Sequence, residues 1–172
     1  MSNPLEDGFV RDAVGVSKII RKLLNRAGLV ALRFTGDVSL EFQRTPTGDD
    51  ETVPVSTVLT LRSQWWIGDR GDREQALQGT LPFKAAPEVT RQALRISGIV
   101  SLFGGGQEVL DAAVNDDGTL VISTLLGALI VSGREDDFEE SWIIDIPTDV
   151  PYHDRWSVVC TSTGELFGRP LL

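Results

Sequence analysis

Residues 18–34, KIIRKLLNRAGLVALRF, carry the two patterns that decide the fold. Before Gly28 the apolar residues recur mostly at spacings of three and four, which is typical of one buried face of a helix. After Gly28 they alternate with polar residues, as in a strand whose successive side chains point to opposite faces. The sequence therefore predicts a helix over Phe9–Arg26, closed by Gly28 at positive φ, and then a hairpin that turns at residues 35–37.

A similar order of patterns returns in the second half of the chain. Residues 88–104, EVTRQALRISGIVSLFG, align with residues 18–34 without a gap and place Gly98 opposite Gly28. Further strand patterns follow in both halves, and the tryptophan segments WWIGD and WIIDI occupy corresponding positions. A second register, which sets LVALRF over VLDAAV, is an open alternative.

This repetition predicts an α+β fold with an internal duplication of a helix plus an antiparallel β-meander unit. One such unit cannot bury its apolar side alone, whereas two units can share one core or extend one sheet. We expect a single compact domain over residues 1–172, with repeat units at about 9–80 and 85–168. A chain of this size buries roughly 70% of the surface that its unfolded form exposes, so it needs no disulfide or metal.

The charge balance restricts the class of partner. With 25 acidic and 16 basic residues, the formal net charge is -9, which disfavours nucleic acid and anionic membrane surfaces and favours a basic protein partner. Solubility alone is the simpler explanation of this charge. The N-terminal residues show no basic region followed by an apolar one, and no apolar run reaches about 18 residues. We therefore expect a cytoplasmic protein that is neither exported nor membrane-spanning.

Three acidic clusters are candidate sites, at residues 48–51, 115–118 and 135–140. None has the spacing of a calcium-binding EF-hand loop, so no metal ligand is predicted. Charged loops often steer association with a basic surface. Solvated turns are the simpler interpretation of all three clusters, and EDDFEE is the candidate for a partner-facing loop; its candidate binding residues are Asp136, Asp137, Glu139 and Glu140.

The adjacent residues Trp65 and Trp66 are the second candidate for partner binding. Alternation along a strand buries one of two neighbours and exposes the other. An exposed tryptophan would be a strong candidate for a binding hot spot, and core packing is the alternative. Trp142 stands in the corresponding segment of the second half.

No motif indicates catalysis or cofactor binding. The glycine run FGGGQE lacks the Lys-Ser/Thr end of a phosphate loop, and neither GxSxG nor HExxH occurs. His153 and Cys160 are the only residues of their kinds, and a strand over residues 156–160 would bury the cysteine as an unreactive thiol. We predict no catalytic residue, no cofactor and no metal. An active site assembled from distant residues would leave no linear motif.

The C-terminal half resembles an uncharacterised actinobacterial family of unknown function. The resemblance rests on DGTLVISTLLGALIV, ESWIIDIP and WSVVCTSTGELFGRP, and covers Leu94 to Arg169. Members look like small duplicated β-meander proteins that end in a tryptophan strand and a Cys-Gly-Glu-Leu segment. Here residues 162–164, Ser-Thr-Gly, stand where that pattern has a double glycine. The family implies no activity, but size and acidity resemble those of immunity proteins of bacterial toxin systems.

The expected function is a non-catalytic cytosolic binding protein of the immunity type, which binds a basic toxin or effector through the acidic loop and an exposed tryptophan. The alternative is a chaperone-like or structural homodimer, in which an exposed meander edge pairs with a second copy. A small-ligand receptor or an enzyme would require a deep pocket with titratable groups, for example around His153.

Overall fold

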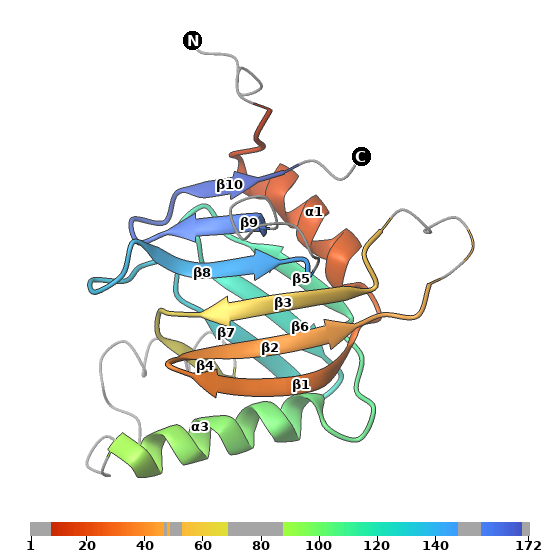
Figure 1. The fold of residues 1–172 in the computed structure, drawn as a ribbon, viewed down its shortest axis with the longest axis vertical. Helices are drawn as coiled ribbons and strands as arrows, with labels where there is room; N and C mark the ends of the chain where they lie inside the picture. Colours follow the sequence, from red (N-terminus) through yellow and green to blue (C-terminus); the bar gives the residue numbers. More distant parts are fainter. Residues whose placement is uncertain (1–7, 47, 49–52, 69–87, 148–155, 170–172) are drawn as a thin grey trace.

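The computed structural model describes residues 8–46, 48, 53–68, 88–147 and 156–169 (Figure 1). The predicted connection between the halves, at residues 69–87, lies outside this part, as does most of the polar loop after residue 46. The elements, in chain order, are α1 Ala13–Leu24, β1 Gly28–Thr35, β2 Asp37–Gln43, β3 Ser56–Leu61, β4 Trp65–Ile67, α3 Glu88–Phe103, β5 Asp111–Val114, β6 Leu120–Thr124, β7 Gly127–Val131, β8 Glu140–Asp145, β9 Trp156–Thr161 and β10 Leu166–Gly168.

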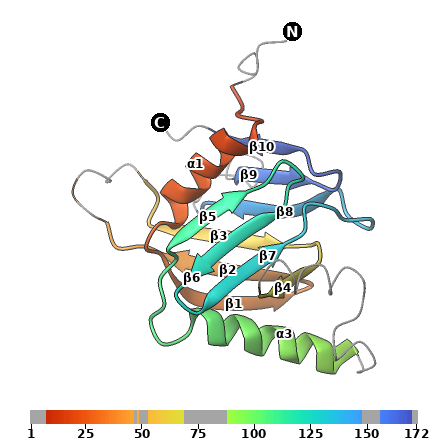
Figure 2. The same cartoon turned by 180° about the vertical axis from the view of Figure 1, so that it is seen from behind.

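The strands form two antiparallel sheets that face each other, with a helix at each of two opposite sides (Figures 1 and 2). The first sheet has the order β1-β2-β3-β8-β9-β10, and the second has the order β4-β7-β6-β5. Helix α1 packs beside β5 and β10, whereas α3 packs beside β4 and β7. The predicted α+β class and the compact arrangement are confirmed. Neither helix that the structure describes combines the length and apolarity needed to cross a bilayer.

The two halves of the chain exchange their fourth strands. Strands β1, β2 and β3 form a meander in the first sheet, but β4 leaves it and pairs with β7 in the second, Trp65 opposite Val131. Strand β8 makes the reverse crossing and pairs with β3, so that Trp142 lies opposite Leu61. Each sheet therefore contains strands from both halves, and neither half forms a separate layer.

The gapless alignment of the two halves is wrong over one segment. Helix α3 continues to Phe103, so residues 99–103 are helical, whereas the residues aligned with them lie in β1. The second helix is longer than the first, 16 residues against 12, and this extra length shifts the later elements along the chain. The strand that follows α3 is β5, which the second register sets opposite β1.

Helix α1 is shorter than predicted and ends differently. Its N-cap is Asp12, whose carboxylate accepts a hydrogen bond of 2.7 Å from the Gly15 N–H. Gly28 does not close the helix at positive φ, because that conformation is taken by Arg26, with φ 56°, and Gly28 begins β1. The reason is tertiary: the Arg26 N–H donates to the Val109 carbonyl, which draws the chain into the turn before Gly28.

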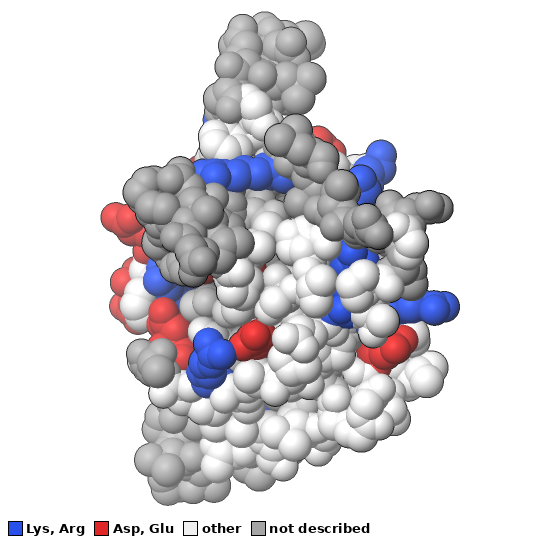
Figure 3. All heavy atoms as spheres, turned by 45° about the vertical axis from the view of Figure 1, so that its right-hand side comes forward, with Lys and Arg blue, Asp and Glu red and all other residues white. Residues whose placement is uncertain are grey.

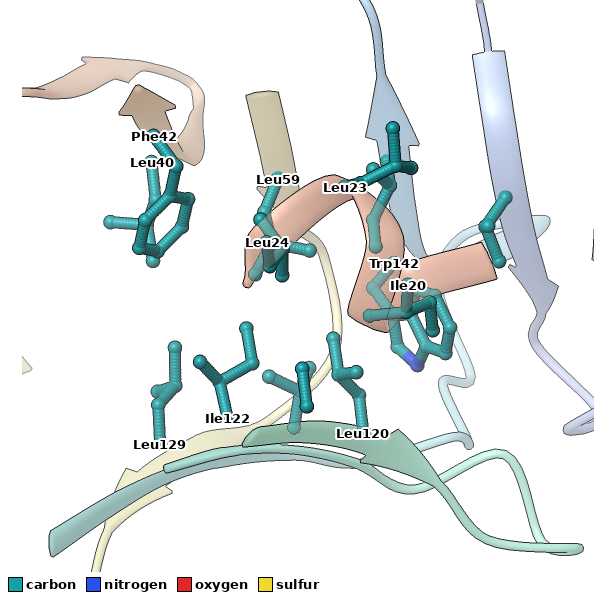
Figure 4. Close-up of a cluster of buried hydrophobic side chains, with 14 of the residues drawn as sticks. Ile20, Leu23, Leu24, Leu40, Phe42, Leu59, Leu120, Ile122, Leu129 and Trp142 are labelled. Atoms are coloured by element: carbon teal, nitrogen blue, oxygen red, sulfur yellow. The ribbon is translucent and has the colours of Figure 1, made fainter. Parts of the chain in front are cut away.

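One hydrophobic core fills the space between the sheets and includes side chains from both halves (Figure 4). Burying one such aliphatic or aromatic side chain stabilises the fold by about 1.5–3 kcal/mol. In Figure 4 the side chains of the first sheet point toward those of the second, and α1 lies across one side. The labelled members are Ile20, Leu23, Leu24, Leu40, Phe42, Leu59, Leu120, Ile122, Leu129 and Trp142.

Candidate functional site: an acidic loop surface

Three loops meet at glycines at the end of the sheets from which β6 and β8 start. A methyl group at Gly118 would lie 2.7 Å from Cys160 Sγ and 2.9 Å from Gly164 Cα, and one at Gly133 would overlap the backbone of Asp117. Gly118 and Gly164 also have positive φ, at 78° and 88°. Only glycine permits this close approach. We call these residues, Gly118, Gly133 and Gly164, the glycine junction.

Hydrogen bonds hold the loops in register across the glycine junction. The Glu135 N–H donates to the Ser162 carbonyl at 3.2 Å, and the Ser162 N–H donates to the Glu139 carbonyl at 2.8 Å. The indole N–H of Trp142, which is fully buried, donates to the Gly118 carbonyl at 2.9 Å. The loop that precedes β8 is therefore fixed both to the neighbouring turn and, through Gly118, to the core.

The outer side of these loops is strongly acidic. We define the acidic loop surface as residues 115–118, 132–140 and 162–165. Its single basic residue is Arg134. Figure 3 shows acidic side chains gathered at its left-hand edge, the side on which these loops lie in Figure 1. The acidic members are Asp116, Asp117, Glu135, Asp136, Asp137, Glu139, Glu140 and Glu165.

An aromatic side chain lies among these carboxylates. Phe138 is 48% exposed, and the Arg62 guanidinium lies 5.9 Å from its ring centroid. Arg62 also forms ion pairs with Asp37 and Glu140, which fixes the guanidinium beside the ring. Sequence reasoning missed Phe138, although an aromatic residue inside a run of carboxylates was a visible signal.

The structure brings together the predicted acidic residues but not the predicted tryptophans. Asp136, Asp137 and Glu139 are exposed on the acidic loop surface, and Glu140 is half-buried beside it. The expected exposure of one tryptophan is wrong and the alternative, burial of both, is confirmed, because Trp65 and Trp66 are only 8% and 5% exposed.

The tryptophans are buried because both faces of β4 are covered. Trp65 points into the shared core, opposite Val131. Trp66 lies on the other face of the strand, opposite Ile130, which is itself buried. Alternation does place the two indoles on opposite faces, but neither face is left to solvent.

Cys160 lies beneath the glycine junction as a buried thiol, as predicted. Its Sγ lies 3.7 Å from the carbonyl oxygens of both Gly118 and Gly133. Burial, together with the nearby Asp117 carboxylate, raises the pKa of the thiol to about 12. The thiol is therefore protonated at neutral pH and is not a nucleophile. His153, the other residue considered for a Cys-His pair, lies outside the described residues.

The described residues contain no group of three Asp, Glu, His or Cys side chains placed to hold a metal ion. Comparison of the chain with protein-family models, with curated proteins and with solved structures finds no match. Function is therefore inferred from the residues and geometry of this chain.

Proposed function

We propose that the chain is a non-catalytic cytoplasmic binding protein that docks a basic partner protein on the acidic loop surface, in the manner of an immunity protein and its toxin. The observation that carries the proposal is the glycine junction, which holds three acidic loops against one another, with the exposed ring of Phe138 in the loop of residues 132–140. The partner class follows from this chemistry: a surface with Lys or Arg side chains around a small apolar recess.

Fixed loops favour binding because little flexibility is lost on docking. Immobilising one flexible side chain costs about 0.5–1.5 kcal/mol on association, and loops that are already ordered avoid part of this cost. The backbone bonds between Ser162 and residues 135 and 139 provide that order. Clustered carboxylates steer a basic partner and raise its association rate, and this effect weakens as salt screens the charges.

Phe138 replaces the tryptophans as the proposed hot spot. Aromatic side chains at the centre of an interface contribute much of its binding energy when a surrounding ring of polar residues excludes water. Phe138 has this setting, with Asp136, Asp137 and Glu139 beside it in the chain and all exposed. The buried Trp65 and Trp66 have no place in the proposed interface.

The homodimer alternative has less support. Its premise is a free sheet edge that pairs with a second copy. The edges of the sheets are β1, β10, β4 and β5. Helix α1 packs beside β10 and β5, and α3 packs beside β4, so that among the described residues three of the four edge strands have a helix as neighbour and β1 is the edge left for such pairing.

The test compares capture of proteins from a lysate of the source organism by the full chain and by four variants. Phe138→Ala and Asp137→Lys change the acidic loop surface. Phe34→Ala is the matched control for Phe138, since its side chain is 49% exposed on β1. Glu108→Lys is the control for Asp137, since it makes the same charge change at an exposed residue before the other end of β5.

We expect wild type and both controls to retain the same basic protein at low salt, identified by mass spectrometry. Retention should fall by at least about tenfold with Phe138→Ala or Asp137→Lys, the size expected when a hot-spot residue is lost. High salt should release the partner. The proposal is wrong if no protein is retained at low salt, or if the controls lose as much binding as the surface variants.

We also infer that the two halves arose by duplication of one unit, a helix followed by four strands. Both halves have this order, and the exchange of β4 and β8 is reciprocal between the sheets. Trp65 and Trp142 each point into the core from an exchanged strand. The inference requires the halves to superpose with β1 on β5 and β4 on β8. Superposition only in another register would contradict it.

A further inference from the structure

A basic hollow lies between the C-terminal half of α1 and the start of β5. Its volume is about 340 Å³. The floor is residues 109–112, where Val109 and Ala112 are buried apolar side chains. The polar lining consists of Arg21, Lys22, Asn25, Arg44 and Asp111.

The charge of this lining is opposite to that of the whole chain. Three cations face one carboxylate in a protein of net charge -9. Figure 3 likewise shows Lys and Arg side chains on the right-hand part of the face, away from the acidic edge. Within the described residues, no carboxylate lies within ion-pair distance of Lys22. Lys22 is therefore available to an incoming anion.

The other two cations have different roles. Arg44 is 6% exposed, and its guanidinium donates to the carbonyls of Val53 and Pro54, so that it forms a fixed charged wall. Arg21 is half exposed and donates through Nε to Asp111 at 2.7 Å, which leaves its terminal nitrogens free of that contact. This pair lowers the pKa of Asp111, chiefly through the hydrogen bond from Arg21.

We propose that the hollow binds the oxyanion, phosphate or carboxylate, of a small ligand whose apolar part rests on Val109 and Ala112. The ammonium of Lys22, the terminal nitrogens of Arg21 and the side-chain amide of Asn25 are the donors. Charge-assisted bonds from such groups are the strong ones in anion recognition. The volume lies at the lower end of the range of small-ligand pockets, about 300–1,000 Å³. This site is independent of the acidic loop surface.

A purely structural role for these cations makes a different prediction. Arg21 and Lys22 stand in the last turn of α1, where positive charge stabilises the negative end of the helix dipole. If that is their only role, their replacement lowers the melting temperature but no ligand binds. Anion binding and thermal stability therefore have to be measured on the same variants.

The test is a titration of the full chain with inorganic phosphate, phenyl phosphate and benzoate as probes, in low-chloride buffer. NMR and calorimetry monitor the binding. We expect saturable binding with shifts at residues 109–112, and tighter binding of phenyl phosphate than of inorganic phosphate because of the apolar floor. The ratio of the dissociation constants of phenyl phosphate and benzoate identifies the preferred oxyanion.

The variants decide between a specific site and diffuse attraction. Lys22→Glu should weaken binding by at least about tenfold, the effect of one lost charge-assisted hydrogen bond. Lys18→Glu is the matched control: it makes the same change on α1 at an exposed residue outside the lining, and should weaken binding less than about twofold.

Asp111→Asn should strengthen binding several-fold, because it removes the carboxylate that competes for Arg21. This variant keeps the proposal testable even if Lys22→Glu disturbs the helix. Three results would overturn the proposal: no saturable binding of any probe, equal losses with Lys18→Glu and Lys22→Glu, or weaker binding by Asp111→Asn.

Discussion

At the scale of single residues, the glycine junction restricts the sequence most strictly, because only glycine fits at its positions. Gly118 and Gly164 have positive φ, so a substitution there would strain the backbone as well as the packing. Gly133 does not have positive φ, so packing alone excludes a side chain at that position. Gly133 is therefore the clean position for a test of the junction.

Gly133→Ala should lower the free energy of unfolding by roughly 1–3 kcal/mol, the usual cost of forcing an extra methyl group into a packed site. The new methyl group would overlap the backbone of Asp117 and Gly118. Gly48→Ala is the control, because Gly48 is exposed and has no atom within 4 Å of an added Cβ. Urea unfolding of both variants measures the difference; equal stabilities would mean that the loops can move apart freely.

The Cys160 thiol predicts a pH dependence of stability. Its pKa is about 12 in the folded protein, against an ordinary 9.0, so between these values the unfolded chain ionises and the folded chain does not. The contribution is fully present below pH 9 and is lost as pH rises toward 12, by up to about 1.4 kcal/mol per pH unit.

Urea unfolding of wild type and Cys160→Ser between pH 8 and about 10.5 measures the contribution of the thiol to the free energy of unfolding, because serine does not ionise in that range. The wild-type curve should fall more steeply than that of the variant. Parallel curves would show that the thiol ionises as readily in the folded chain as in the unfolded one. The control for access is an aromatic disulfide reagent, which should react with the thiol only after urea unfolds the chain.

At the scale of elements, a buried hydroxyl bonds α1 to β5. Ser17 Oγ accepts a hydrogen bond of 2.9 Å from the Val114 N–H, and Ser17 is 4% exposed. A serine on the buried face of an amphipathic helix looks like an exception to the apolar pattern. Its position is explained only by the strand, which ends at Val114 and presents its N–H to the helix.

Ser17→Ala should therefore destabilise the protein by about 1–3 kcal/mol, because it leaves the Val114 N–H buried without a partner. Ser97→Ala in α3 is the matched control, since Ser97 is exposed and alanine favours the helix. Thermal unfolding followed by circular dichroism compares the two. An unchanged melting temperature for Ser17→Ala would mean that water or a backbone shift satisfies Val114.

At the scale of the whole molecule, the exchange of β4 and β8 ties the two halves together. Neither half can unfold without removing a strand from the sheet of the other. We therefore expect one cooperative transition, with coincident curves from circular dichroism and tryptophan fluorescence in urea. Trp65 and Trp142 report on the two exchanged strands. Two separate transitions would show that the halves fold independently despite the exchange.

Sequence patterns were sufficient for the existence of most elements, though not for the ends of α1, and for one part of the candidate site. Helices α1 and α3, the hairpin at residues 35–37 and the strands of the second half all follow from local periodicity and turn residues. The exposure of Asp136, Asp137 and Glu139 follows as well, because burying several neighbouring charges in a core would cost a large free energy. Periodicity also placed Trp65 and Trp66 on opposite faces of a strand.

Only the tertiary structure decided which elements cover each face of a strand and which loops meet. The sequence by itself determined that Trp65 and Trp66 lie on opposite faces of a strand, but the burial of Trp66 depends on neighbours from distant segments. The same holds for the meeting of Gly118, Gly133 and Gly164, and for the pairing of Arg26 with Val109 that moves the helix end away from Gly28. The physical reason is that periodicity indicates which face of a helix or strand is apolar. Contacts between distant segments depend instead on how the whole chain packs.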